Sequence, residues 1–137
     1  MNIYCDESLS SLFLNAKQSP RKRAHFNLHS SFDDKVQRLF IALVKGSYVK
    51  PHYHELSHQW EMFVVISGTV RICIFDITGQ LEKEILVGDG QQSKVIELFP
   101  NEVHSVECIS ETALMLEVKE GPFNPKFAKV ESAIVLP

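Results

Sequence analysis

The sequence has few cysteines, no long apolar run and no strong excess of either charge. Its three cysteines are odd in number and lack CxxC spacing, which argues against a disulfide framework and against a thiolate zinc site. No run approaches the ~18 apolar residues that cross a bilayer. The start, MNIYCDESLSS, has neither the basic residues nor the apolar stretch of a signal peptide. We therefore expect a cytoplasmic protein with no membrane partner.

The charge balance also excludes a general attraction for polyanions. Fourteen basic and seventeen acidic residues leave a net charge of −3, so nucleic acid is not an expected partner and any anion recognition must be local. A length of 137 residues with 45% hydrophobic residues suits one globular core. We expect an N-terminal helical segment over 1–20 and a single domain over 21–137.

Helical spacing is confined to the N-terminus. Leu9, Leu12 and Ala16 recur at helical intervals and Pro20 discourages continuation, so the spacing predicts a short helix over 7–18. Short runs rich in Val, Ile and Phe follow, such as WEMFVVISG and TVRICIFD, and turn sequences separate them. Because no amphipathic helix intervenes to make a parallel crossover, these strands predict a mainly β sandwich, jelly roll or small barrel.

Three histidines and two glutamates cluster within residues 46–68, GSYVKPHYHELSHQWEMFVVISG. His52 and His54 are two residues apart, so on an extended strand both imidazoles point to one face and can converge on one ion. Glu61 opens the next apolar strand, and His104 begins a strand after a proline turn. A lone HxH pair is more often a surface feature, but these four side chains together would form a mixed N/O site for a divalent transition metal ion.

The wider spacing resembles the two-part motif of the cupin superfamily, G-x5-HxH-x3-4-E-x6-G followed by a histidine after a proline turn. The matching positions outside the HxH pair are Gly46, Glu61, Gly68, Pro100 and His104. The resemblance implies the cupin double-stranded β-helix, a jelly-roll barrel, preceded here by the short N-terminal helix. It also implies one metal ion, Fe, Zn, Mn, Ni or Co, held by His52, His54, Glu61 and His104.

The motif is not matched throughout. Six residues separate His54 from Glu61 where the family has three or four, and PNEVH is shorter than the usual PxGxxH. The carboxylate or extra imidazole position is therefore open among Glu55, His58 and Glu61. Glu61 is favoured because it keeps the six-residue spacing to Gly68. His58 is expected near the rim of the site, where it would face a substrate.

A closer resemblance spans about residues 21–127. The segments RAHFNLHSSFDDKVQRLFIAL, GSYVKPHYH, WEMFVVISG, FDITGQ, VIEL and LEVKEGPFNP are similar to WbuC-type cupin-fold metalloproteins. These are small single-domain bacterial proteins associated with polysaccharide gene clusters. The resemblance implies a role in polysaccharide-related metabolism and leaves the reaction open.

Several polar residues are candidates for contact with a small-molecule ligand. His25, Asn27 and His29 alternate in AHFNLHSS, so all three could line a pocket, and an exposed arm is the alternative. Arg38 lies in an otherwise apolar strand, where a guanidinium needs an anionic partner. The RKR segment at 21–23 is most often a solvated surface, and an anion clamp is the functional alternative. Downstream, Glu117 and Lys119 either reach the pocket mouth or pair on the surface.

Two functions from different classes fit this pattern. A four-ligand site leaves positions open for water, substrate or dioxygen, which favours a metal-dependent isomerase, epimerase or oxygenase acting on a small polar or sugar-derived substrate. The alternative is a non-catalytic protein that binds metal and a small ligand for sensing or carriage. A purely structural module is the weakest reading, because it needs no clustered ligands. Cupins are often dimers through their sheet edges, so a homodimer is the default expectation.

Overall fold

Two five-stranded sheets form the body of the protein. The computed structural model describes residues 1–132, and within them one α-helix precedes ten β-strands. The helix is α1 (Asp6–Gln18). The first sheet contains, in spatial order, β1 (Arg23–Asn27), β2 (Val36–Val44), β9 (Thr112–Glu120), β4 (Glu61–Ser67) and β7 (Val95–Leu98). The second contains β10 (Val130–Glu131), β3 (Tyr48–Tyr53), β8 (Val103–Cys108), β5 (Thr69–Phe75) and β6 (Leu81–Gly88).

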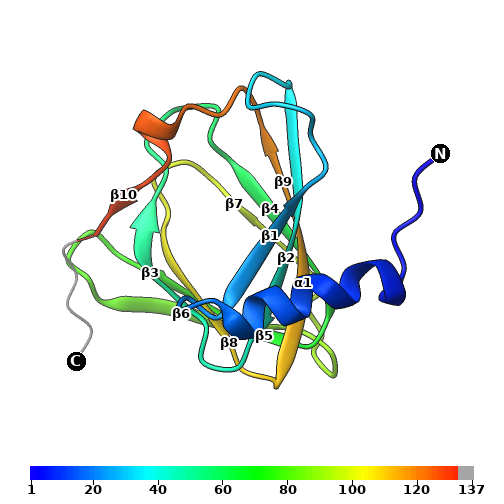
Figure 1. Ribbon diagram of the computed structural model, residues 1–137. Helices are drawn as coiled ribbons and strands as arrows, with labels where there is room; N and C mark the ends of the chain where they lie inside the picture. The colour runs from blue at the N-terminus through cyan, green and yellow to red at the C-terminus, as the bar shows by residue number, and fades with distance from the viewer. Residues whose placement is uncertain (133–137) are drawn as a thin grey trace.

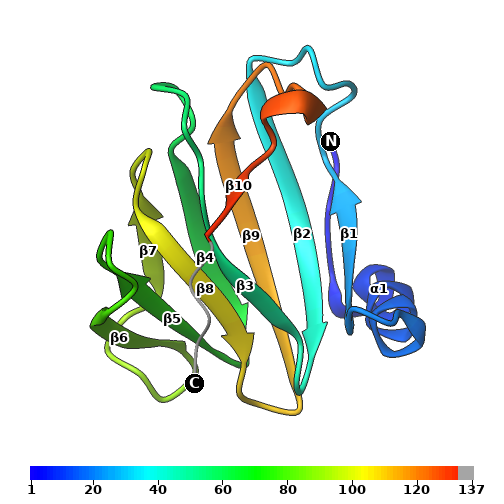
Figure 2. The same ribbon diagram turned by 90° about the vertical axis from the view of Figure 1, so that its left-hand side faces the viewer.

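The sheets pack face to face as a jelly-roll sandwich (Figures 1 and 2). Neighbouring strands in both sheets pair antiparallel. Several neighbours are distant in sequence, since β9 lies between β2 and β4, and β8 lies between β3 and β5. The predicted mainly β jelly roll with a short N-terminal helix is confirmed.

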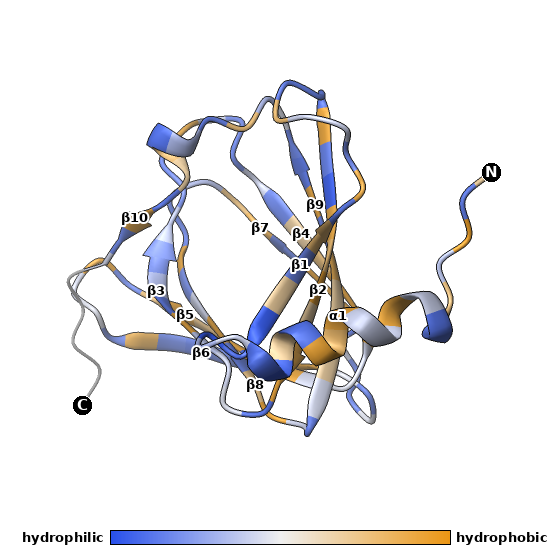
Figure 3. Cartoon of the chain, viewed as in Figure 1, coloured by the Kyte–Doolittle hydropathy of each residue, from blue (hydrophilic) through white to orange (hydrophobic). Residues whose placement is uncertain are grey.

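The helix covers the outer face of the first sheet. Leu9, Leu12 and Ala16 are buried and pack against a cluster that includes Phe40 and Ala42 of β2. Figure 3 shows hydrophobic and hydrophilic residues alternating along this helix. Burying each leucine contributes roughly 1.5–3 kcal/mol, so the helix is held by packing as well as by its own hydrogen bonds. Within residues 1–132, no helix combines the length and the apolar character of a membrane-crossing segment.

A second hydrophobic cluster fills the space between the two sheets. Leu43 of β2, Phe63 of β4 and Met115 of β9 meet Ile72 of β5 and Val106 of β8, all at most 4% exposed. The same cluster forms the apolar floor of a cavity that opens beyond it. The core therefore sets the distance between the sheets at the place where polar residues begin.

Gly68 makes the tight connection between β4 and β5. Its φ of +74° is unfavourable for residues with a side chain. A Cβ atom there would lie 2.1 Å from the carbonyl oxygen of Thr112 and 2.7 Å from the Cα of Ala113. This close approach of two backbones explains why the residue between β4 and β5 is a glycine.

Candidate metal centre

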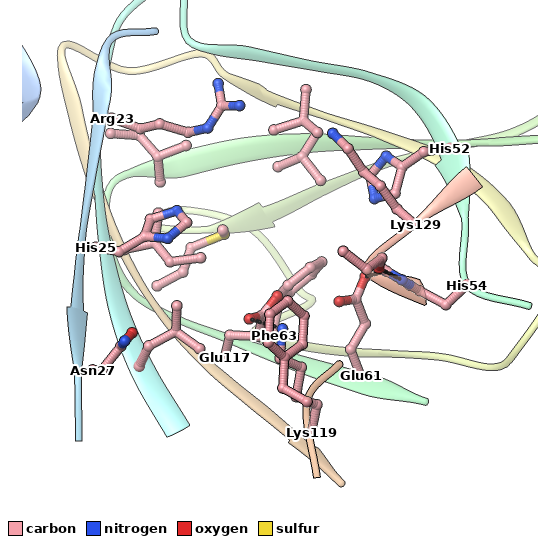
Figure 4. A pocket seen from close by; sticks show the side chains of 18 of the residues that line it. Arg23, His25, Asn27, His52, His54, Glu61, Phe63, Glu117, Lys119 and Lys129 are labelled. Atoms are coloured by element: carbon pink, nitrogen blue, oxygen red, sulfur yellow. Dashed lines mark hydrogen bonds and ion pairs between the residues drawn. The ribbon is translucent and has the colours of Figure 1, made fainter. Parts of the chain in front are cut away.

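The cavity between the two sheets has a volume of about 440 Å³, a size suited to a small-molecule ligand. Its floor is apolar and includes Leu43, Phe63 and Met115. Its walls are polar. Figure 4 shows Arg23, His25 and Asn27 on one side, facing His52, His54 and Glu61 on the other.

Three different strands bring four candidate ligands together. His52 lies near the end of β3, and its Cα is opposite that of His104 on β8. The register of this pair shifts between Val49 and His52, where Pro51 has no N–H to donate. His54 follows β3 directly, and Glu61 is the first residue of β4.

The ligand atoms of these four residues are buried and close. One atom from each of His52, His54, Glu61 and His104 lies within 4.8 Å of the others. His104 is 1% exposed, Glu61 3% and His52 6%. The ring centroids of His52 and His104 are 4.3 Å apart, and those of His52 and His54 are 5.3 Å apart. The structure thus places the four predicted residues around one point, and they could hold a metal ion.

Backbone carbonyl groups orient all three imidazoles. Nδ1–H of His52 donates to the carbonyl of Lys50 (2.8 Å), and Nδ1–H of His104 donates to that of Glu102 (2.9 Å). Nδ1–H of His54 donates to the carbonyl of Ala128, which is 74 residues away in the sequence (2.7 Å). Since a carbonyl oxygen only accepts, each Nδ1 carries the hydrogen and each neutral ring leaves Nε2 with a lone pair. This is the tautomer that a metal requires of a ligand bound through Nε2.

Three of the ligand atoms then face one another without a hydrogen to share. Glu61 Oε1 lies 2.9 Å from Nε2 of His104 and 3.2 Å from Nε2 of His54. Within residues 1–132, none of these three buried atoms has a hydrogen-bond partner. Lone pairs buried side by side are costly, and a bound cation removes that cost. The donor set therefore fits a metal ion.

Two pKa values in the cluster, those of Glu61 and His52, are shifted in the direction that favours metal binding, whereas that of His54 is raised, because the pairing of its ring with Glu61 outweighs burial. Burial would raise the pKa of the Glu61 carboxyl, but an Nε2–H of His104 or His54, present when either ring is protonated in place of a bound cation, holds it well below its usual range. Burial, together with the neighbouring His104 ring, lowers the pKa of His52 to about 4. Near neutral pH, Glu61 is ionised and His52 is neutral, as a metal requires of these ligands.

The C-terminal part of the described chain closes against this cluster. The carbonyl that accepts from His54 belongs to Ala128, which follows a short 3₁₀ turn, η1 (Pro125–Phe127). The side chain of Gln59 donates to the carbonyl of Phe127. Farther on, β10 pairs with β3 beside His52. Nothing in the sequence pattern marked these residues, because their contribution comes from backbone carbonyls.

The N-terminal part of the cavity contains most of the other predicted contacts. His25 and Asn27 of β1 and His29 beyond it all line the cavity, as do Arg21 and Arg23. His29 is 8% exposed, and its Nδ1 accepts a hydrogen bond from the backbone N–H of Arg38 in β2 (3.0 Å). The two arginines, which the sequence more readily suggested as solvated surface, instead face the site.

Two polar residues of β9 also face inward. Glu117 and Lys119 line the cavity and form an ion pair of 3.4 Å. Burial raises the pKa of Glu117 to about 7, and the negative charge of Glu61 adds to the shift. The sequence left open whether these residues reach the pocket or pair on the surface, and the structure shows that they reach the pocket.

Two predicted contacts are not at the cavity. Arg38 is exposed, because it lies on the same outward face of β2 as Phe40, whereas Leu39 faces inward. The expectation that Arg38 supplies a pocket cation is therefore corrected. His58 lies half-buried in the turn after His54 and does not line the cavity.

Glu55, the alternative carboxylate ligand, does not belong to this cluster. Glu55 is exposed, and the group of ligand atoms found within residues 1–132 contains Glu61 instead. The long loop between His54 and Glu61 leaves the six-residue spacing from Glu61 to Gly68 intact.

Solved structures from several bacteria share this fold. The conserved protein SPY1581 of Streptococcus pyogenes has a TM-score of 0.56 and 19% identity, over 77% of this chain and 80% of that one. CapF, a capsular polysaccharide assembling protein of Staphylococcus aureus, has a TM-score of 0.66 and 19% identity, over 83% of this chain and 33% of CapF. For oxalate decarboxylase OxdC of Bacillus subtilis the values are 0.59 and 20%, over 80% of this chain and 27% of that one.

The chain spans only about a third of CapF and about a quarter of the decarboxylase, and at these identities the likeness concerns the fold alone. No curated protein matches the chain in sequence. The model of the family described as "Domain of unknown function (DUF6016)" matches residues 4–87, more than half of the chain, and the protein belongs to that family.

Proposed function

We propose that this protein is a metal-dependent enzyme that acts on a small polar or sugar-derived substrate. The observation that carries the proposal is the buried convergence of three imidazoles and one carboxylate on the wall of a cavity of about 440 Å³. His52, His54, Glu61 and His104 would hold the ion. When bound, it would supply Lewis-acid polarisation of a substrate carbonyl or hydroxyl oxygen.

The other polar residues of the cavity would orient the substrate and move protons. Glu117 faces the cavity between β1 and Glu61 (Figure 4), where its carboxyl can exchange a proton with a bound molecule. Lys119 balances the charge of that carboxyl from the same strand. His25 and Asn27 on the opposite wall can donate hydrogen bonds to hydroxyl groups. The apolar floor excludes water from one side of the substrate.

Two comparisons support a role in bacterial polysaccharide metabolism. The sequence resembles WbuC-type proteins of polysaccharide gene clusters, and CapF, which shares the fold, is a capsular polysaccharide assembling protein. The decarboxylase from Bacillus subtilis has Mn(II) centres. Manganese is therefore the first ion to test at a site made of nitrogen and oxygen ligands.

The test begins with metal content. Protein purified without a histidine tag and without chelator should contain about one transition-metal equivalent per chain by elemental analysis. The loaded protein should then be incubated with sugars, nucleotide sugars and small hydroxy acids, and NMR should follow conversion. Turnover that stops on chelation and returns with the metal supports the enzyme. Metal and ligand binding without turnover would instead identify a binding protein, and absence of metal even after reconstitution would remove the proposal.

A further inference from the structure

The cavity contains two arginines whose charge is not balanced within the described chain. Arg21 and Arg23 both line it, and neither forms an ion pair within residues 1–132. The two lysines of the cavity differ from them. Nζ of Lys119 lies 3.4 Å from a carboxylate oxygen of Glu117, and Nζ of Lys129 lies 3.9 Å from a carboxylate oxygen of Glu131 on β10. The excess positive charge therefore belongs to the arginines.

The backbone directs both arginines to the same side. Lys22 stands between them with a φ of 57°, a conformation uncommon for residues other than glycine. Its side chain lies beside Gly46 and does not line the cavity. Arg23 begins β1, and its guanidinium donates a hydrogen bond to the carbonyl of Arg21 (3.3 Å). This turn thus places two arginines at the cavity, Arg23 half-buried and Arg21 exposed, and directs the lysine side chain elsewhere.

The electrostatics of the adjacent histidine agree with this picture. Part of His25 is exposed, but the cavity wall desolvates its ring, and this desolvation together with the positive charges of Arg21, Arg23 and Lys119 lowers its pKa to about 4. Burial likewise lowers the pKa of Arg23, with a further contribution from Arg21. Two like charges side by side at the cavity wall, the one on Arg23 half-buried, gain from an anion that binds between them.

We propose that Arg21 and Arg23 bind an oxyanion group of the substrate, a carboxylate or a phosphate, at the end of the cavity formed by β1. The guanidinium group offers a planar fork of N–H donors that matches both anions, and its charge does not depend on pH in the neutral range. The substrate is then a small organic anion, with its charged group on the arginines and an oxygen at its other end near His52 and Glu61. Only the placement of that oxygen near the candidate metal ligands rests on the proposed function, and the anion site at the arginines does not.

The site for the charged group can be tested without the metal. Inorganic phosphate is the probe, added to the protein as purified and to chelator-treated protein, with thermal unfolding and titration calorimetry as readouts. Binding to the folded state should raise the melting temperature in a saturable way in both preparations. An Arg21→Gln/Arg23→Gln variant should bind phosphate at least about 10-fold more weakly, as expected when charge-assisted hydrogen bonds are removed. Lys22→Gln is the matched control, because it removes one charge from the same turn outside the cavity.

The second arm identifies the anion. Glycerate, malate and 3-phosphoglycerate share an α-hydroxy acid end, while the opposite end is a hydroxymethyl, a carboxylate or a phosphate group. Metal-loaded protein should bind one or both of the charged-ended probes about 10-fold more tightly than glycerate, and the arginine double variant should lose that difference. Stronger binding of malate would assign the site to a carboxylate, and stronger binding of 3-phosphoglycerate would assign it to a phosphate.

The results separate this inference from the proposed enzyme. Phosphate binding that disappears in the double variant and persists in Lys22→Gln supports the anion site even if no metal or turnover is found. Arg23→Lys, which keeps the charge and loses the fork, should bind phosphate with intermediate affinity. The inference would be overturned if wild type and the double variant bound phosphate equally well. It would also be overturned if wild type bound no phosphate and showed no preference among the three organic probes. Neither result would affect the proposed metal centre.

Discussion

The two ends of the cavity are built differently. At the end formed by β3, β4 and β8, His52, Glu61 and His104 are at most 6% exposed, and backbone carbonyls orient the imidazoles. At the end formed by β1, Arg23 is half-buried and His25 is exposed. Among residues 1–132, the side chain of Arg23 donates a hydrogen bond only to the carbonyl of Arg21.

This difference separates two chemical tasks. A metal ion needs ligands held in fixed directions, and the directions must exist before the ion arrives. A substrate anion is recognised by charge and by a fork of donors, which tolerates side chains that adjust on binding. We infer that the buried end is preorganised for coordination and that the open end provides selectivity.

The largest effect should follow from removing two imidazoles at the buried end. His52→Ala combined with His54→Ala should abolish metal retention, because two of the four donors are lost. Elemental analysis of the purified variant measures it. His58→Ala is the control outside the cavity and should retain full metal content. Loss of metal in that control would make His58 a ligand and would contradict the placement of the site.

Removing the carboxylate charge should have the next largest effect. Glu61→Gln keeps the shape of the side chain but loses the anionic oxygen that faces His104 and His54. Metal affinity should fall by about 10-fold or more, measured by competition with a chromogenic chelator. Glu55→Gln should leave affinity unchanged, since that side chain is exposed. The opposite ranking of the two variants would assign the ligand position to Glu55.

The C-terminal segment offers a test of orientation without touching a ligand. A chain that ends after residue 127 lacks the Ala128 carbonyl, so Nδ1–H of His54 loses its acceptor. Metal affinity of the folded protein should fall by about 10-fold, as for other groups that orient a ligand from behind. A chain that ends after residue 132 keeps this carbonyl and the β10 pairing, and should bind metal like the full chain. Equal affinity of both shortened chains would show that the carbonyl does not matter.

The smallest effect concerns pH and the open end. The lowered pKa of His25 means that the folded protein takes up a proton there only near pH 4, whereas an unfolded chain does so near the usual histidine pKa of 6.5. The unfolded state therefore binds more protons between these values, and stability falls as the pH is lowered through this window. Unfolding free energies from urea titrations at pH 7 and pH 5 should differ less in His25→Gln than in wild type. An unchanged difference would show that His25 is not the group responsible.

Some of the site followed from local sequence rules. Two residues separated by one on a strand point to the same face whatever the rest of the fold, so the pairing of His52 with His54 was predictable. Glu61 was favoured over Glu55 and His58 by the resemblance to the cupin motif, because it keeps the six-residue spacing to Gly68. The position of His104 in a strand after a proline turn, as in the cupin motif, indicated the fourth candidate metal ligand. The proposed homodimer has no such local signal and stays a prediction.

The tertiary structure alone decided which face of each remaining strand turns inward. In β2 both faces are apolar, because α1 covers Phe40 while the core covers Leu39, so alternation could not show that Arg38 points outward. The inward direction of Arg21 and Arg23 depends on how the chain turns at Lys22.

What the sequence determined by itself is therefore the fold class and the local spacing of the ligands, since hydrophobic period and strand geometry act over a few residues. What only the tertiary structure decided is how distant segments complete the site. His54 meets a carbonyl 74 residues away, and Arg21 and Arg23 line the same cavity as the candidate metal ligands, in the space between the two sheets. Backbone carbonyls carry no residue-specific signal, and long-range contacts have no fixed spacing in the chain, so neither could be predicted from the order of the residues.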